Sequence, residues 1–314
     1  MSKFLKQTGL FFLLLLLIFL AGWLIPSKWI TESLHYSVYD KHKLLDETTD
    51  KPSRIIFAGG SNMSFGVYSP AVEASLGITT INTAIHAAYG LKYILDDLEP
   101  YVKKNDIIVL APEYAQFQKD SFLGAAALVQ GLNVIPQNLK LLDSRQWILF
   151  FKNLPRHALS KIRFYLSSLF ANNASIDAYH RLAFNSHGDV EGHWSYQTEL
   201  SKSPDVLAGQ YNPEVISYMK KFETSIEKRG AQLLIAFPAF NQSSFSYNQK
   251  VIEQLHHELQ QSGMELLGTP ERYSFPDNLY YDSAYHLNKV GQFKRTNLLI
   301  EDLKPYLQNA TLSH

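Results

Sequence analysis

The sequence lacks two things that would have pointed to particular functions: cysteine and an excess of charge. None of the 314 residues is cysteine, which excludes disulfides, thiolate metal sites, cysteine nucleophiles and a lipidated N-terminal cysteine. Lys and Arg together number 29, as do Asp and Glu. A nucleic-acid backbone is therefore not an expected partner, and any catalytic chemistry falls to Ser, His, Asp and Glu.

One long apolar run, GLFFLLLLLIFLAGWLI at 9–25, is about the length of a bilayer crossing. Lys3 and Lys6 precede it, so we expect a cytoplasmic N-terminus and an extracytoplasmic or periplasmic remainder. A cleaved signal peptide is the alternative, although LAGWLIPSKW has bulky residues where a cleavage site needs small ones. We expect a cytoplasmic tip and transmembrane anchor at 1–28, followed by a polar and aromatic stalk at 29–52.

Apolar runs of strand length then alternate with amphipathic helical patterns. The strand-like runs are RIIFAGG, GITTINTA, NDIIVLAPEY, AQLLIAFPAF and MELLGT. Because these runs do not alternate between apolar and polar residues, they are typical of parallel strands covered on both faces. The order of elements predicts an α/β fold with right-handed crossovers and a final helix that follows Asn288 and runs through Lys304.

The alternation breaks between the third and fourth strands, where QNLKLLDSRQWILFFKNL and KIRFYLSSLFANN have helical patterns. We interpret this stretch, at about 118–209, as a helical insertion. Such an insertion can form a lid or substrate wall, serve as structural padding, or rest its apolar helices on a membrane.

Ser61 follows the first predicted strand and two glycines, at the start of a predicted helix. Ligands of parallel sheets bind beyond the carboxyl ends of the strands, where backbone N–H groups can stabilise an oxyanion. Ser61 is therefore a candidate nucleophile, with a simple N-cap as the alternative and Ser64 as a rival. The segment AGGSNMSFG ends unlike a Walker A loop and does not match the G-x-S-x-G elbow.

His286 follows Asp282 by four residues, just before the last predicted helix. Such a pair can supply a general base and the carboxylate that fixes its tautomer, as a serine nucleophile requires. A histidine that only caps or packs is the alternative. His180, His187 and His193 are spaced too loosely to indicate a metal site, so we expect neither a metal nor a cofactor.

Taken together, these segments resemble the SGNH (GDSL-like) hydrolase superfamily over about 54–307. The chain is similar to its membrane-anchored envelope members, relatives of the D-alanyl transfer and alginate O-acetylation proteins. Their segments N-x-G-x-H-A-G, D-x-V-V-L-x-P-E-Y and D-S-x-Y-H-L-N correspond here to NTAIHAAYG, DIIVLAPEY and DSAYHLN. The resemblance implies a flavodoxin-like three-layer sandwich at 53–310, with Ser61 as nucleophile, His286 as base and Asp282 as its orienting carboxylate.

The chain departs from the superfamily pattern in the spacing of its acid and base. Three residues separate Asp282 from His286, where two are usual, so Asp277 is an alternative carboxylate. In the second matching segment, Asn82 and His86 are candidates for bracing the loop.

The expected oxyanion donors also differ from the family's. The resemblance implies backbone N–H groups of Ser61 and of Ala84, which stands in place of a glycine. The family's third-block asparagine is missing, and Glu113 and Tyr114 stand near its place. Because a carboxylate would repel a developing oxyanion, Tyr114 is the preferred third donor.

These features and the resemblance imply an exported, membrane-anchored serine esterase or O-acyltransferase. It would act on acyl groups of a cell-envelope polysaccharide or related polymer through an acyl-enzyme that water or a sugar hydroxyl resolves. The expected partners are that polymer, the membrane, and a membrane-bound acyl-transfer protein. The alternative is a catalytically inactive glycan-binding or assembly factor, which the missing asparagine favours.

Overall fold

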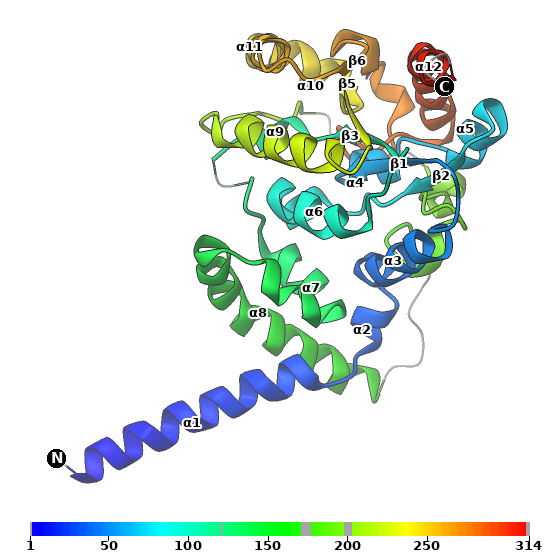
Figure 1. Cartoon of the computed structure of the whole chain (residues 1–314). Coiled ribbons are helices and arrows are strands. Elements are labelled where there is room, and N and C mark those ends of the chain that lie inside the picture. The colour runs from blue at the N-terminus through cyan, green and yellow to red at the C-terminus, as the bar shows by residue number, and fades with distance from the viewer. Residues whose placement is uncertain (1, 120, 171–176, 198–202, 312–314) are drawn as a thin grey trace.

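The computed structural model describes residues 2–119, 121–170, 177–197 and 203–311 (Figure 1). Its centre is a five-stranded sheet in which neighbouring strands are all parallel, in the order β2-β1-β3-β4-β6. The strands are β1 (Arg54–Gly59), β2 (Thr79–Asn82), β3 (Ile107–Ala111), β4 (Gln232–Ala236) and β6 (Leu266–Leu267). This order is that of flavodoxin-like doubly wound folds. The predicted α/β fold with a parallel sheet is therefore confirmed.

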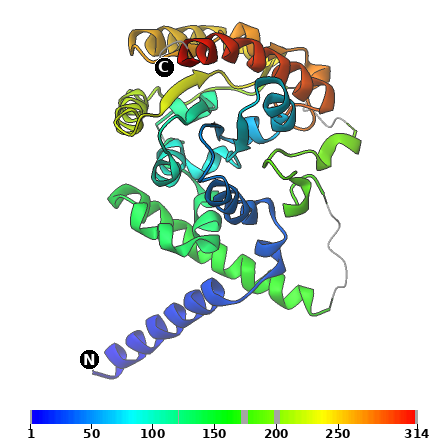
Figure 2. The same cartoon turned by 45° about the vertical axis from the view of Figure 1, so that its right-hand side comes forward.

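Helices cover both faces of the sheet, as the non-alternating strands require. Every residue of β1 and β3 is buried. One face is covered by α3 (Ser37–Glu47), α6 (Leu91–Leu98) and α9 (Glu214–Glu227). The other is covered by α5 (Ser69–Leu76), α11 (Gln249–Gln261) and α12 (Lys289–Thr311) (Figures 1 and 2). Helix α12 begins directly after Asn288, as predicted, and extends beyond its predicted end.

Short elements complete the carboxyl edge of the sheet. Helix α4 (Ser61–Ser64) follows β1, and α10 (Gln242–Tyr247) precedes α11. A separate pair of short strands, β5 (Phe240–Asn241) and β7 (Ser274–Phe275), is also parallel.

The N-terminal helix α1 (Ser2–Leu24) extends away from the rest of the molecule (Figures 1 and 2). Its segment Lys3–Leu24 has a mean hydropathy of 2.2, and its apolar part is not buried inside the protein. The helix is thus long and apolar enough to cross a membrane, a test that a signal sequence also passes.

The segment 29–52, predicted as a stalk, is instead folded onto the domain. It contains most of α2 (Lys28–Thr31) and all of α3. Val38, Lys41 and Leu45 in α3 are buried. Their spacing of three and four residues places them on one helix face, which the many charged residues of DKHKLLDE concealed in the sequence.

The insertion between β3 and α9 forms its own helical layer, with α7 (Ala126–Val134) and α8 (Ser144–Ser168) lying between the sheet domain and α1 (Figures 1 and 2). Helix α8 starts at a capping box, in which the Asp143 carboxylate accepts the Gln146 N–H at 2.9 Å. The parts of the predicted insertion at 120, 171–176 and 198–202 lie outside the described residues.

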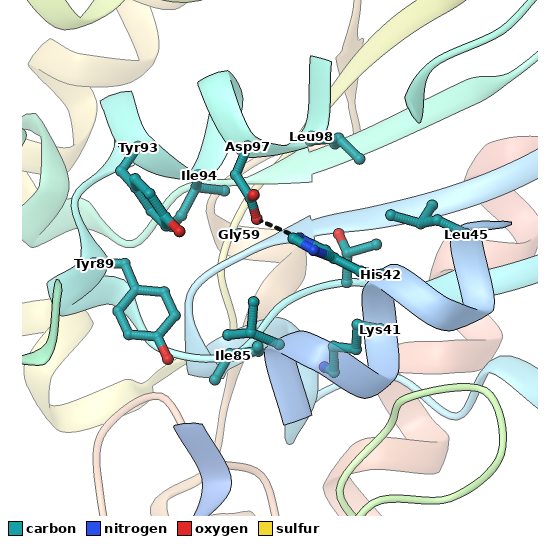
Figure 3. Close-up of a pocket in the computed structure, with 12 residues that line it drawn as sticks. Lys41, His42, Leu45, Gly59, Ile85, Tyr89, Tyr93, Ile94, Asp97 and Leu98 are labelled. Carbon is teal, nitrogen blue, oxygen red and sulfur yellow. Dashed lines mark hydrogen bonds and ion pairs between the residues drawn. The ribbon is translucent and has the colours of Figure 1, made fainter. Parts of the chain in front are cut away.

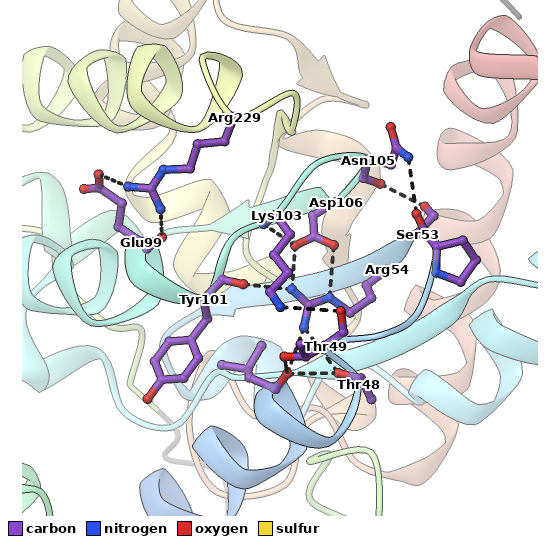
Figure 4. A network of polar contacts seen from close by, with 12 residues as sticks. Thr48, Thr49, Ser53, Arg54, Glu99, Tyr101, Lys103, Asn105, Asp106 and Arg229 are labelled. Atoms are coloured by element: carbon purple, nitrogen blue, oxygen red, sulfur yellow. Dashed lines mark hydrogen bonds and ion pairs between the residues drawn. The ribbon is translucent and has the colours of Figure 1, made fainter.

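A buried ion pair joins the amino ends of the strands, opposite the edge that carries Ser61 (Figure 4). Arg54 donates to both oxygens of Asp106, at 3.0 and 2.6 Å, and also to the carbonyl oxygens of Leu45 and Tyr101. Arg54 and Asp106 are only 1% and 2% exposed. The extra acceptors offset the cost of burying the guanidinium and tie α3 to the sheet.

Candidate active site

Ser61 lies at the carboxyl edge of the sheet, where β1 turns into α4. A Cβ on Gly59 would stand 2.5 Å from the Ala111 carbonyl oxygen, and Gly59 has a φ of 144°, so this turn requires glycine. Beyond the turn, the Ser61 hydroxyl lies 2.8 Å from Nε2 of His286. The two residues are 225 positions apart in the sequence, and the parallel sheet brings them to one edge.

His286 and Asp282 share a loop that folds back on itself. Tyr280 and Leu287 form an antiparallel bridge, and the Tyr281 N–H donates to the His286 carbonyl oxygen at 2.8 Å. This loop places Nδ1 of His286 2.7 Å from the Asp282 carboxylate. Three intervening residues therefore permit the contact, and Ser61, His286 and Asp282 form a continuous hydrogen-bonded chain.

Two aromatic residues fix the ring of His286. Phe65 stacks on the ring at 4.1 Å with an interplanar angle of 11°. The Tyr179 hydroxyl donates to Asp282 and lies 3.3 Å from Nδ1 of His286. Burial raises the pKa of Asp282, but hydrogen bonds from His286 and Tyr179 outweigh it and hold that pKa below its ordinary value. Asp282 therefore stays ionised and able to orient the imidazole.

A second carboxylate, that of Glu113, also reaches Ser61. Its Oε1 lies 3.2 Å from the Ser61 hydroxyl oxygen and accepts the Asn62 N–H at 3.1 Å. The strand register explains the contact: Gly59 pairs with Ala111, and Ser61 and Glu113 each lie two residues further along. Burial raises the pKa of Glu113 despite the opposing hydrogen bonds.

Two of the three predicted oxyanion donors, Ala84 and Tyr114, have surroundings that differ from each other. The Ala84 N–H donates to Oδ1 of Asn82 at 3.1 Å, and the Ala84 carbonyl oxygen accepts from Ser64 and Lys41, so this peptide is used inside its own loop. Tyr114 packs against Phe240, and its buried hydroxyl has no hydrogen-bond partner among the described residues.

The segment of the second loop that reaches the Ser61 turn is Ala87. A Cβ on Gly60 would lie 2.7 Å from the Ala87 Cβ and 2.6 Å from Oε1 of Glu113. Gln116 connects these two neighbours, because it accepts the Glu113 N–H and donates to the Ala87 carbonyl oxygen, both at 3.0 Å. The loops after β1, β2 and β3 thus converge on one point.

The alternative site residues lie in other surroundings. Ser64 is buried and donates to Ala84, and Asp277 accepts the Ser243 N–H at 3.1 Å. Asn82 braces the second loop, since its amide donates to the Met63 carbonyl oxygen at 2.9 Å and to Asp189 at 2.8 Å.

The other histidines considered as site residues have separate contacts. Burial lowers the pKa of His86 to about 4, and its Nδ1 accepts the Ala88 N–H. His193 contacts the Leu287 carbonyl oxygen at 2.8 Å, whereas His180 and His187 have separate partners. Within the described ranges, no group of three His, Asp or Glu residues is arranged to hold a metal ion.

The small cavity in Figure 3 is separate from Ser61 and lies between α3, α6 and the loop after β2. Lys41, Gly59 and Tyr89 are among the residues that line it, together with His42 and Asp97, which contact each other at 2.9 Å. Burial lowers the pKa of Lys41 to about 7. Because Lys41 donates to the Ala84 carbonyl oxygen, α3 holds the loop after β2 in place.

The sequence did not predict that Phe65, Glu113 and Tyr179 contact Ser61 or His286. Phe65 follows Ser61 by four residues, a helical spacing that offered a weak signal. Glu113 precedes Tyr114 directly in the sequence, and the expected charge repulsion favoured Tyr114 as the donor. Tyr179 had no signal, because only folding of the insertion brings it to His286.

Comparisons with known proteins add little to this geometry. No family model and no curated protein matches the chain. Among solved structures, it is similar to a crystal structure of protein YXIM from Bacillus subtilis, with 14% sequence identity and a TM-score of 0.37. The match covers 82% of this chain but only 57% of that one. A likeness this low assigns neither family nor activity.

Proposed function

We propose that this protein is a serine esterase or O-acyltransferase of the SGNH type. The observation that carries the proposal is the hydrogen-bonded chain from Ser61 through His286 to Asp282, at 2.8 and 2.7 Å. These distances are within the range that a nucleophile, its base and an orienting carboxylate need.

The steps of acyl transfer follow from these two hydrogen bonds. As the Ser61 oxygen attacks an acyl carbonyl, its proton passes to Nε2 of His286, and Asp282 stabilises the imidazolium through Nδ1. When the tetrahedral intermediate collapses, His286 returns that proton to the departing alcohol and leaves an ester on Ser61. Water or a sugar hydroxyl then gives its proton to His286 and attacks the ester, and His286 passes that proton to the Ser61 oxygen as the acid or the new ester leaves.

The substrate and setting come from the resemblance and from α1. With α1 as an uncleaved anchor and Lys3 and Lys6 on the cytoplasmic side, the domain faces the envelope. Its substrate is then an acylated envelope polysaccharide or related polymer, and its partner a membrane-bound acyl-transfer protein.

A catalytically inactive binding or assembly factor is the second candidate function. The observation that favours it is Glu113, whose Oε1 lies 3.2 Å from the Ser61 hydroxyl and, if ionised, would oppose an oxyanion there. This candidate retains the fold and the hydrogen-bonded chain but predicts no activated serine.

Labelling of the purified full-length protein with a fluorophosphonate probe separates the two. We expect the probe to modify Ser61, and both Ser61→Ala and His286→Ala to abolish the modification. Matched controls are Ser75→Ala and His257→Ala, which change exposed residues outside the site and should label as the wild type does. A folded wild type that no serine probe modifies would contradict the enzyme and favour the binding role.

A further inference from the structure

Helix α8 has an apolar stripe on the side that faces away from the protein. Ile148, Phe151, Leu159 and Leu166 are 71%, 61%, 54% and 52% exposed. Their spacings of three, eight and seven residues keep them on one side of a helix with 3.6 residues per turn. Leu169, directly after the helix, continues the stripe and is 60% exposed. Large apolar side chains aligned in this way mark a contact surface.

The charge of α8 is of one sign. Its sequence, SRQWILFFKNLPRHALSKIRFYLSS, has five basic residues and no acidic one. Lys161 is buried and Arg145 pairs with Glu214, whereas the other three basic side chains are exposed: Lys152, Arg156 and Arg163. By helical spacing they follow one border of the apolar stripe. An apolar stripe bordered by cations matches the surface of an anionic bilayer.

A tight joint holds α8 against the last turns of α1. A Cβ on Gly22 would lie 2.6 Å from the Ala158 Cβ, so only glycine lets the two helices approach this closely. The Trp23 carbonyl oxygen, at the end of α1, accepts from Lys161 at 2.7 Å and from Asn133 at 3.0 Å. These donors complete the carbonyl end of α1 and fix its position relative to the insertion.

The length of α1 sets the depth of this joint. The 22 residues of Lys3–Leu24, at about 1.5 Å each, span roughly 33 Å, which is close to the hydrocarbon thickness of about 30 Å. If α1 crosses a bilayer, Gly22 and Trp23 lie at its boundary, where tryptophan is favoured. Helix α8, packed on these residues, then lies at the same level.

We propose that α8 is an interfacial helix, with its apolar stripe inserted into the surface of the bilayer that α1 crosses and Lys152, Arg156 and Arg163 against anionic lipid headgroups. The insertion then supports the sheet domain at a fixed height above the lipid surface. This proposal does not depend on the chemistry at Ser61.

The absence of cysteine allows a direct test with single labels. We would introduce Phe151→Cys or Leu159→Cys into the full-length protein, attach an environment-sensitive fluorophore, and reconstitute each variant into anionic nanodiscs containing nitroxide lipids. The matched control is Val251→Cys, an exposed apolar position on α11, on the far side of the sheet from α8 (Figure 1). We expect several-fold stronger quenching at both α8 positions than at the control, and more from nitroxides near the headgroup than from nitroxides at the chain ends.

A second variant tests the role of charge. Changing Lys152, Arg156 and Arg163 together to glutamine should lower quenching at the labelled Leu159→Cys position in anionic nanodiscs, and the variant should respond less than the parent when anionic lipid is replaced by neutral lipid. Equal, weak quenching at Leu159→Cys and Val251→Cys would overturn the proposal. It would also be overturned if the α8 labels were shielded by a second copy of the chain, seen as energy transfer between differently labelled molecules.

Discussion

Replacing Glu113 by glutamine tests whether this residue must be neutral for Ser61 to act. Oε1 of Glu113 lies 3.2 Å from the Ser61 hydroxyl oxygen and accepts the Asn62 N–H, so an ionised Glu113 would place a negative charge beside the reacting serine. Because burial raises the pKa of Glu113, the side chain keeps its proton to a higher pH than an ordinary glutamate. The neutral acid can donate a hydrogen bond to the oxyanion, and the glutamine amide can do the same.

The size of the effect follows from Coulomb's law. Two unit negative charges about 4 Å apart repel by about 4 kcal/mol at the effective dielectric constant of partly buried sites. That energy in the transition state corresponds to roughly a 10³-fold difference in rate. We therefore expect the labelling rate of Glu113→Gln, divided by that of the wild type, to rise with pH as Glu113 ionises. Taking this ratio at each pH cancels the titration of the groups that do not interact with Glu113.

The pH dependence of the protein's stability tests the raised pKa of Glu113 independently. A carboxyl whose pKa is raised in the folded protein stabilises the fold at low pH, and this contribution is lost as pH rises through the raised value. Thermal unfolding should therefore show that Glu113→Gln loses less stability than the wild type over that interval. Glu253→Gln, on the exposed side of α11, is the matched control. If Glu113→Gln labels more than about tenfold slower at every pH, an ionised Glu113 is required and the reasoning is refuted.

Three further predictions concern the same framework. Asp282→Asn should slow labelling by orders of magnitude while leaving the fold intact, because His286 loses the acceptor that fixes its tautomer; an unchanged rate would refute this role. Gly60→Ala should slow labelling about 10²-fold, since its new Cβ would meet Ala87 and displace the turn; labelling at the wild-type rate would count against the convergence of the loops. Arg54→Ala should cost about 3–5 kcal/mol of unfolding free energy by denaturation, because it leaves a buried carboxylate unpaired; a loss below about 1 kcal/mol would contradict this.

Much of the fold could be predicted because it depends on local pattern. Non-alternating apolar runs indicated buried parallel strands, and Asn288 marked the start of the last helix. The same logic placed Ser61 and His286 at one edge of the sheet, since parallel strands all end there. In contrast, the segment 29–52 was misjudged as a stalk because its charged residues hid the apolar face of α3.

What the sequence by itself determined was the order of strands and helices, the apolar N-terminal helix, and the residues able to carry acyl-transfer chemistry. Only the tertiary structure decided which of these residues meet. The pairing of Gly59 with Ala111 put Glu113 rather than Tyr114 beside Ser61, and folding of the insertion brought Tyr179 to His286. Strand register and long-range packing depend on the summed fit of many side chains, so no local stretch of sequence specifies them.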